Sequence, residues 1–371
     1  MNGGAAPHDG ELTIESLGGW PSVLGRLADG ADLGAAEAGT AMTDVLEGNA
    51  TPAQIAAFVF GLRCKGETVE EMTGLVAAML AASEPVPVEA DLAGRLVDTC
   101  GTGGDRSGTI NVSTIAALVV AGAGVPVCKH GGRAASSRAG SADVLEALGV
   151  VIDLGPRGVA RCVREAGIGF CFAPRYHPAM RHAIPIRREL GVPTAFNFLG
   201  PLANPARVRR QVVGVGDPAM ASKMVRVLAA GGADHVLVVH GADGLDELST
   251  TGPSTLHEFR REEHGPAAGR FEVTELDATQ LGLRRSSVEE LRGGDATTNA
   301  ELARRVLAGD AGAQRDIVVL NAAAGLVVGG RCPDLAAGVE LASQVIDDGR
   351  AAGCLERLVS VSQEAAGVDP R

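Results

Sequence analysis

Apolar and polar positions follow a helical period through the first part of the chain. Capping-box patterns begin at Thr51 and at Thr68, where a threonine is followed three residues later by Gln or Glu, and both mark helix starts. The second pattern runs into an apolar-periodic stretch that ends near Ala82, where a Glu-Pro-Val-Pro segment stops it. Residues 13–88 therefore predict an α-helical domain, and residues 1–12 a disordered tail.

Further along, short apolar runs alternate with amphipathic segments. The runs that predict buried strands cover 95–100, 125–128, 168–172, 211–215 and 235–240. The segments that predict helices include 113–123, 141–148, 218–230, 298–307, 313–326 and 334–348. Such alternation is typical of an α/β domain with a mostly parallel central sheet flanked by helices. We expect this domain to span 91–173 and 206–371, whereas the proline-rich segment 174–205 returns to the helical domain, with Pro185 kinking a helix there.

The amino-acid composition disfavours several classes of protein, among them membrane-spanning, secreted and nucleic-acid-binding proteins. Hydrophobic residues make up 46% and charged residues 21% of the chain, as in globular proteins, and no apolar run reaches the roughly 18 residues of a membrane span. The first residues lack the basic and apolar regions of a secretion signal. A net charge of -12 disfavours nucleic acid as a partner. Seven cysteines without a CxxC pair argue against disulfides or zinc and for a reducing cytoplasm.

A glycine-rich segment, Gly-Thr-Gly-Gly-Asp over 101–105, follows the first predicted strand, and Asn-Val-Ser-Thr over 111–114 opens the next helix. Glycines let backbone N–H groups approach a ligand, and a helix N-terminus adds a positive dipole end. Together they predict a diphosphate cradle, although an ordinary tight turn would look the same. Asp105 is expected to accept from a ribose hydroxyl or to organise the loop. Ser113 is expected to cap the helix or bind a phosphate-bound Mg²⁺.

A second loop, Lys-His-Gly-Gly-Arg-Ala-Ala-Ser-Ser over 129–137, follows the next predicted strand. The chain has 33 basic residues but only three lysines, so Lys129 suggests a need for a compact ammonium group. The loop suits a second phosphate contact, and the alternative is a basic surface loop.

Adjacent carboxylates, Asp246 and Glu247, come shortly after the strand predicted over 235–240. Oxygen ligands at the end of a strand suit a hard cation, and Mg²⁺ between them and a diphosphate would remove the repulsion of like charges. The alternative is a solvated acidic surface.

A fourth segment, Pro-Arg-Tyr-His-Pro-Ala-Met over 174–180, runs toward Arg187 and Arg188. An arginine here could form two hydrogen bonds to a substrate carboxylate, although a surface arginine pair is the alternative.

These four segments have the order and spacing found in the anthranilate phosphoribosyltransferase family, which the chain resembles from Thr51 to the Asn-Ala-Ala-Ala segment over 321–324. The resemblance implies a fold shared with nucleoside phosphorylases and a homodimer formed through the helical domain. It implies Mg²⁺-dependent transfer of the phosphoribosyl group from phosphoribosyl diphosphate (PRPP) to the amine of anthranilate, a step of tryptophan biosynthesis. Two Mg²⁺ ions are implied, one held by Ser113 with the diphosphate and one by Asp246 and Glu247.

The resemblance also assigns residues to the two substrates. Those implied for PRPP lie in the glycine-rich loops and at the helix start: Gly101, Gly104, Asp105, Thr109, Asn111, Ser113, Thr114, Lys129, Gly131, Arg133, Ser136 and Ser137. Those implied for the aromatic acceptor are Gly101, His130, Gly132, Pro174, His177, Met180 and Arg187. Arg187 is expected to face the acceptor carboxylate, and His130 is the one candidate for a general base.

Two positions depart from the family pattern. Arg106 stands where a third loop glycine is usual, and Gly132 stands where the second loop usually has asparagine. Gly132 leaves open a paralogous enzyme that acts on another aromatic acid. A nucleoside phosphorylase and a nucleic-acid-binding member of the fold are further alternatives.

Overall fold

The computed structural model describes residues 12–105, 107–134, 138–262 and 269–367. Its internal contacts divide the chain into two units, one made of 1–83 with 177–199 and the other of 84–176 with 200–371. The chain passes between the units after residues 83, 176 and 199, whereas the sequence analysis expected boundaries at 88, 174 and 205. The proposed tail lies outside the described residues except for Leu12.

The first unit is a helical bundle. Its elements are α1 (Gly19–Ala28), α2 (Ala35–Glu47), α3 (Pro52–Lys65), α4 (Val69–Ala81), the 3₁₀ turn η1 (Pro178–His182) and α10 (Ile184–Leu190). Both predicted capping boxes are confirmed, because Thr51 accepts from the N–H of Gln54 and Thr68 from that of Glu71. The edge-to-face pair of Trp20 and Phe58 lies in the core of this unit.

The expected kink at Pro185 was wrong. Instead of a single helix running through this proline, η1 ends at His182 and α10 begins at Ile184, which places Pro185 in the first turn of α10. A proline costs little there, because the N–H groups of a first turn have no partner within the helix. Helix α11 (Phe196–Leu202) follows.

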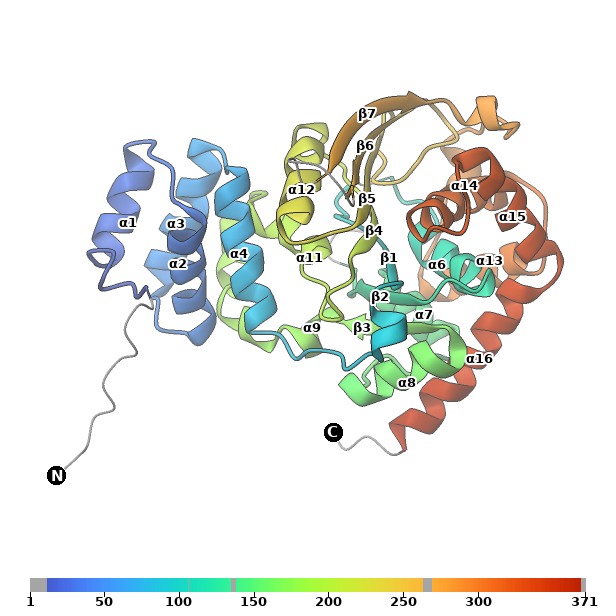
Figure 1. Cartoon of the computed structure of the whole chain (residues 1–371), viewed down its shortest axis with the longest axis horizontal. Coiled ribbons are helices and arrows are strands. Elements are labelled where there is room, and N and C mark those ends of the chain that lie inside the picture. The colour runs from blue at the N-terminus through green and yellow to red at the C-terminus, as the bar shows by residue number, and fades with distance from the viewer. Residues whose placement is uncertain (1–11, 106, 135–137, 263–268, 368–371) are drawn as a thin grey trace. The chain divides into compact units, whose positions relative to one another are not determined.

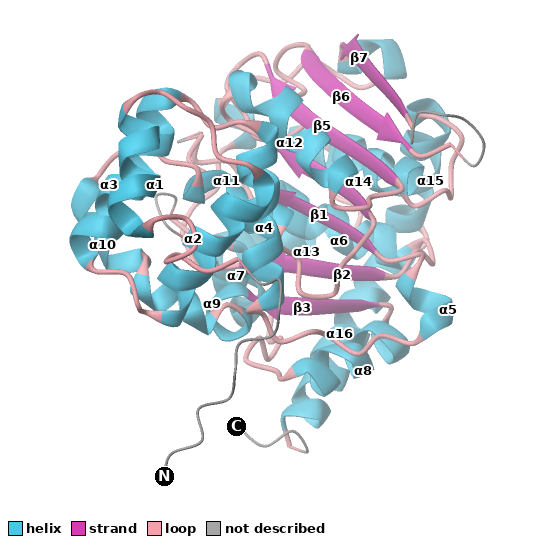
Figure 2. Cartoon of the chain, turned by 60° about the vertical axis from the view of Figure 1, so that its left-hand side comes forward, coloured by secondary structure: helices cyan, strands magenta, loops and turns pink. Residues whose placement is uncertain are grey.

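The second unit contains one seven-stranded sheet in the order β3-β2-β1-β4-β5-β6-β7 (Figure 2). The strands are β1 (Val97–Gly101), β2 (Val127–Gly131), β3 (Ile168–Phe172), β4 (Arg210–Gly214), β5 (His235–Gly241), β6 (Ser254–Arg260) and β7 (Arg270–Leu276). Strands β1 to β5 are parallel, and β6 and β7 are antiparallel, so the predicted mostly parallel sheet is confirmed. The sequence predicted neither β6 nor β7, because their exposed positions break up the apolar run that identifies a buried strand.

Helices flank this sheet on both faces; in Figure 1, α12 lies on one side of the strands and α6 and α14 on the other. The helices of the unit are α5 (Ala90–Ala93), α6 (Val112–Gly122), α7 (Ser141–Ala147), α8 (Pro156–Ala166), α9 (Ala173–Tyr176), α12 (Pro218–Ala230), α13 (Ala296–Leu307), α14 (Ala313–Val328), α15 (Leu335–Asp347) and α16 (Arg350–Ala366), with the 3₁₀ turns η2 (Ala278–Leu281) and η3 (Glu289–Leu291). No described helix has both the length and the apolar character needed to cross a membrane.

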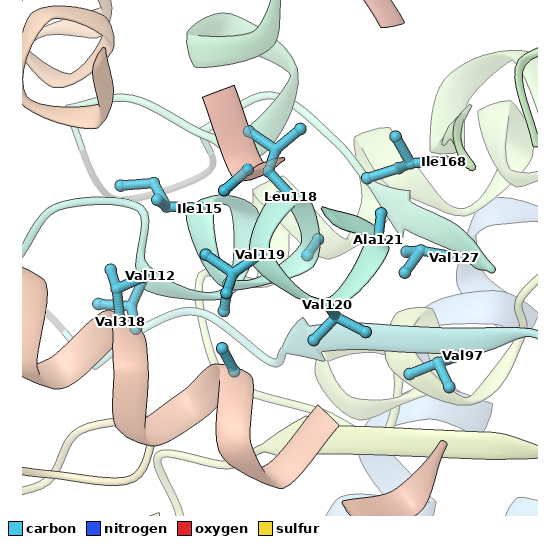
Figure 3. Packing of buried hydrophobic residues seen from close by; sticks show 14 of the residues in the cluster. Val97, Val112, Ile115, Leu118, Val119, Val120, Ala121, Val127, Ile168 and Val318 are labelled. Atoms are coloured by element: carbon cyan, nitrogen blue, oxygen red, sulfur yellow. The ribbon is translucent and has the colours of Figure 1, made fainter. Parts of the chain in front are cut away.

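Helix α6 is the centre of the core. Its residues are apolar on every side and nearly all of them are buried, as expected for a helix enclosed by other elements. Figure 3 shows Ile115, Leu118 and Val120 on this helix, with Val97 of β1 and Val318 of α14 nearby. Because α6 is held on all sides, its N-terminal turn has a fixed position at the carboxyl ends of the parallel strands, where ligands bind in sheets of this kind.

Candidate active site

Two facing glycines allow a loop to cross the ends of the central strands. Gly101 of β1 pairs with Gly214 of β4 in the sheet. A Cβ atom on Gly214 would lie 1.6 Å from the backbone oxygen of Asp246, and one on Gly101 would lie 2.2 Å from Oδ2 of the same residue. The loop after β5 therefore rests directly on these strand ends. It brings the predicted metal pair to the first glycine-rich loop, although the two motifs are far apart in sequence.

The two carboxylates bind backbone N–H groups of the predicted phosphate cradle. Asp246 Oδ2 accepts from the N–H of Gly103 at 2.7 Å, and Glu247 Oε1 accepts from the N–H of Ser113 at 3.0 Å. The second of these bonds lies in the first turn of α6, where the helix dipole favours negative charge. Asp105 organises its own loop, since its carboxylate accepts from the hydroxyl of Ser107 at 2.6 Å.

The electrostatics of this pair suit a divalent cation. Burial, followed by repulsion from Asp105, raises the pKa of Asp246 to about 7. Burial, followed by repulsion from Asp246, raises the pKa of Glu247 well above its ordinary value, while Lys129 opposes this shift. A Mg²⁺ ion, which prefers oxygen ligands, would supply the missing positive charge. No group of three or more His, Cys, Asp or Glu side chains that could hold a metal occurs among the described residues.

Lys129 lies inside the unit, with only 2% of its surface exposed. Its ammonium group donates to the backbone oxygen of Thr99 and lies 3.4 Å from Oγ of Ser113. The sequence suggested a compact cation at this position, and the structure places that cation beneath the start of α6. There it links β1 and β2 to Ser113 and supplies positive charge close to Glu247.

The second glycine-rich loop is tied to α7 by Arg133. Its guanidinium donates to Asp143 at 2.8 Å and to Glu146 at 2.5 Å, and it lies over the ring of Phe172. In this structure, carboxylates therefore occupy Nη1 of the guanidinium that the sequence assigned to phosphate. Gly132 lies in the same loop. Arg106, Ser136 and Ser137 lie outside the described residues.

The loop between β1 and α6 is fixed by amide hydrogen bonds. Asn111 donates to the backbone oxygen of Ala139 at 3.0 Å, and its own Oδ1 accepts from Asn299 of α13 at 2.8 Å. Thr109 forms an isolated β-bridge with Arg292. These contacts hold the segment between Asp105 and Ser113.

The residues predicted for the acceptor fall in both units. His130 and Pro174 belong to the α/β unit, as does Gly132, whereas His177 and Met180 belong to the helical unit, together with Arg187. Nδ1 of His130 lies 3.0 Å from the backbone oxygen of Gly200. A carbonyl only accepts hydrogen bonds, so Nδ1 carries the proton and Nε2 has the lone pair that a general base needs.

Within the helical unit, Arg187 stands out by its surroundings. Its guanidinium lies 5.6 Å from the ring centre of Phe196, and burial lowers its pKa. Among the residues that the structure describes, no acidic side chain forms an ion pair with it. A partly buried cation with an aromatic ring beside it suits a planar aromatic carboxylate.

Asn321 has a role that the sequence reasoning missed. This residue of α14 is 2% exposed; its Oδ1 accepts from the N–H of Leu248 at 2.9 Å, and its Nδ2 donates to the oxygens of Leu248 and Ile317. It thereby fixes the backbone immediately after Glu247. An amide within the apolar run of α14 was a signal, because a buried polar group needs specific partners.

A helical bundle joined to an α/β domain with this site defines a class of glycosyl transferases. The α/β domain model of the glycosyl transferase family matches residues 93–352, and its helical bundle domain matches residues 21–83.

The chain belongs to the anthranilate phosphoribosyltransferase family. The enzyme of that name from Thermomicrobium roseum is 54% identical over 93% of this chain and 97% of its own length, and the one from Rhodococcus jostii is 52% identical over 94% of each chain. The crystal structure of the Thermus thermophilus enzyme, 42% identical, covers 92% of this chain and 99% of its own with a TM-score of 0.84. A Saccharomyces cerevisiae structure in complex with PRPP and Mg, 25% identical, covers 93% of this chain and 98% of its own with a TM-score of 0.83.

Proposed function

We propose that this protein transfers the 5-phosphoribosyl group of PRPP to the amine of anthranilate, giving N-(5-phosphoribosyl)anthranilate and diphosphate. The observation that carries the proposal is the carboxylate pair, Asp246 and Glu247, held against the N–H groups of the glycine-rich loop and of α6. Its direct test is the Mg²⁺-dependent formation of phosphoribosylanthranilate from the two substrates. Release of a free base from a nucleoside and phosphate, without PRPP, would instead identify a nucleoside phosphorylase.

The chain's own groups suit the stabilisation of a departing diphosphate. When the diphosphate leaves C1 of the ribose, the sugar becomes oxocarbenium-like and negative charge grows on the leaving group. The N-terminus of α6 adds the positive end of a helix dipole near that charge, and Lys129 adds a fixed cation beside Ser113. Mg²⁺, one ion with Ser113 and one with Asp246 and Glu247, would supply further positive charge when bound.

The acceptor needs to be held rather than activated. An aromatic amine is neutral and already nucleophilic, so its orientation beside C1 supplies much of the rate enhancement. We assign the acceptor carboxylate to Arg187, with Phe196 beside it, and keep His130 as a candidate base, because its Nε2 can accept a proton. The remaining acceptor residues stay as predicted from the sequence.

Replacing Arg187 with alanine should weaken acceptor recognition far more than PRPP recognition. Loss of a charged hydrogen bond costs about 1.5–3 kcal/mol, so we expect the KM for anthranilate to rise roughly 10- to 100-fold. Steady-state kinetics with each substrate varied in turn measure the effect. Arg188→Ala is the matched control, because this neighbouring arginine is exposed. Equal losses for both substrates would instead give Arg187 a structural role.

Gly132→Asn tests the departure of the second loop from the family pattern. The backbone angle φ of Gly132 is not positive, and a Cβ atom there would meet only Ala173, at 3.9 Å, so the backbone accepts a side chain at this position. An added amide hydrogen bond contributes about 0.5–1.5 kcal/mol, so we expect anthranilate use to improve roughly 2- to 10-fold. Kinetics with anthranilate and with substituted or salicylate-like acids measure it. Loss of activity, together with faster turnover of another acid by the unmodified protein, would identify a different acceptor.

We further propose that the protein acts in the cytoplasm as a homodimer formed through its helical unit. That unit carries exposed large apolar side chains, including Phe60 of α3 and Ile184 of α10, which water solvates poorly. Light scattering of the purified chain measures the oligomeric state.

A gel shift at low salt tests the alternative that the protein binds nucleic acid, against which the net charge of -12 argues.

A further inference from the structure

Strands β1 and β2 lie side by side but share only one pair of ladder partners. The pairs β1–β4, β2–β3 and β4–β5 are each in register over the full five residues of a strand. Between β1 and β2, only Val97 and Val127 are paired. Backbone groups of the two strands beyond this point therefore need other partners, because buried N–H and C=O groups are seldom left without one.

A carboxylate and an amide fill this gap. Asp98, with no exposed surface, accepts from the N–H of His130 at 3.2 Å through Oδ1 and from Nδ2 of Asn204 at 2.8 Å through Oδ2. Asn204, 3% exposed, also donates to the backbone oxygen of Cys128 at 2.8 Å. Its Oδ1 accepts from the N–H of Ala206 at 2.9 Å. Both carboxylate oxygens of Asp98, and both Oδ1 and Nδ2 of Asn204, therefore have hydrogen-bond partners.

The bridge joins the bases of the two predicted substrate loops. Strand β1 leads into the loop over 101–105, and β2 leads into the loop over 130–133. Asp98 lies three residues before the first loop and binds the N–H of His130, near the end of β2. The ammonium group of Lys129 spans the same gap to the oxygen of Thr99. Side chains, rather than ladder hydrogen bonds, therefore set the distance between these loops.

We propose that Asp98 and Asn204 are positioning residues that set the spacing of the two PRPP-binding loops; this inference rests on the proposed phosphoribosyl transfer. A buried carboxylate is a costly way to join two strands, since apolar side chains or a continued ladder would serve stability as well. Its advantage is geometric. A rigid acceptor with two fixed donors holds the strands apart by a defined distance, as a preorganised site requires.

Exchanging the two residues separates the pairing from general stability. In Asp98→Asn, the new amide has a single acceptor oxygen, so it cannot accept from both the N–H of His130 and Nδ2 of Asn204, and the bridge between the strands is lost. In the double variant Asp98→Asn with Asn204→Asp, donor again meets acceptor, the N–H groups of His130 and Ala206 keep their acceptors, and only the oxygen of Cys128 loses its donor. Ser362→Ala is the matched control, because Ser362 is fully buried and accepts from the N–H of Val151, on α16 away from the site.

We expect Asp98→Asn to lower kcat/KM for PRPP roughly 100-fold, since a displacement of about 1 Å has effects of this size. The KM for PRPP should rise, whereas the KM for anthranilate, which depends on Arg187, should change less than about twofold. The double variant Asp98→Asn with Asn204→Asp should have a kcat/KM for PRPP at least about tenfold higher than that of Asp98→Asn alone. Ser362→Ala should retain the kinetics of the unmodified protein while its melting temperature falls. Hydrogen exchange at the amide of His130 should be slow in the unmodified protein and in the double variant, and fast in Asp98→Asn.

The proposal would be overturned by unchanged PRPP kinetics in a folded Asp98→Asn protein. It would also be overturned if the double variant Asp98→Asn with Asn204→Asp recovered none of the lost activity. If Asp98→Asn does not fold, the double variant provides the test, because a double variant that also failed to fold would contradict the pairing. An unmodified protein without transferase activity would overturn the proposed function instead. The hydrogen-exchange rates of the His130 amide would then still show whether Asp98 and Asn204 hold the two loops at a fixed distance.

Discussion

Replacing Asp246 and Glu247 together with alanine should lower kcat/KM for PRPP by roughly 1,000-fold or more, because the developing diphosphate charge loses its metal. The double variant Asp246→Asn with Glu247→Gln separates charge from loop position. Its amide oxygens can still accept from the N–H groups of Gly103 and Ser113, as the carboxylates do now. Both double variants should be similarly inactive. Near-normal turnover of either one at low Mg²⁺ would contradict the metal assignment.

The same substitutions should change how stability depends on pH. Burial and Asp105 raise the pKa of Asp246 from 3.8 to about 7, so the folded, metal-free protein binds its proton more tightly than the unfolded chain does. The stabilisation is complete below pH 4 and is lost as the pH rises through 7. Mg²⁺ competes with that proton, and it should therefore raise the melting temperature more at pH 8 than at pH 6. Both double variants should lose this Mg²⁺ effect, and an equal effect in the variants would place the ion elsewhere.

The sequence predicted the parts of the site that have a local signature. Glycines after a buried strand identified the loop over 101–105, and adjacent acids after a later strand identified Asp246 and Glu247. The parallel sheet explains why these segments meet, since carboxyl ends of parallel strands share one edge. The roles of Asn299 and Asn321 were missed, because an isolated asparagine becomes informative only when its partners, distant in sequence, are known.

Charged residues were harder to interpret than glycines. Lys129 and Arg133 stay predicted to bind phosphate; in the structure Lys129 is buried between strands and Arg133 is paired with Asp143 and Glu146. A long side chain can reach several partners, so its sequence position does not determine which one it binds. Asp98 illustrates the same limit, because the sequence placed it in a buried strand, and only the short ladder between β1 and β2 gives its carboxylate a purpose.

Gly214 shows what a strand pattern hides, and it gives the second large effect. Within the predicted strand over 211–215, this glycine looked like an ordinary apolar position. In the structure it provides the space in which the backbone of Asp246 crosses the sheet. A glycine inside a strand often marks such a close approach. The carboxylate pair can therefore reach the phosphate cradle only if position 214 has no side chain.

Gly214→Ala should consequently disable the site without changing a single ligand. A methyl group 1.6 Å from a backbone oxygen cannot be accommodated by a rotamer change, so the loop that carries Asp246 and Glu247 must move. Overpacking of this kind costs roughly 1–3 kcal/mol of stability, and a displacement of about 1 Å at a metal-binding pair should reduce kcat/KM for PRPP roughly 100-fold. The Mg²⁺-dependent rise in melting temperature should shrink as well.

Gly94→Ala is the matched control for this substitution. Gly94 ends α5 in the same unit, its φ of -72° suits any residue, and an added Cβ atom meets nothing within 4 Å. It should therefore retain the activity and the Mg²⁺ response of the unmodified protein. Steady-state kinetics and thermal unfolding with and without Mg²⁺ compare the two variants. If Gly214→Ala also kept near-normal turnover, the loop after β5 would have another stable position, and the contact between Asp246 and Gly103 could not be what holds the carboxylate pair in the active site.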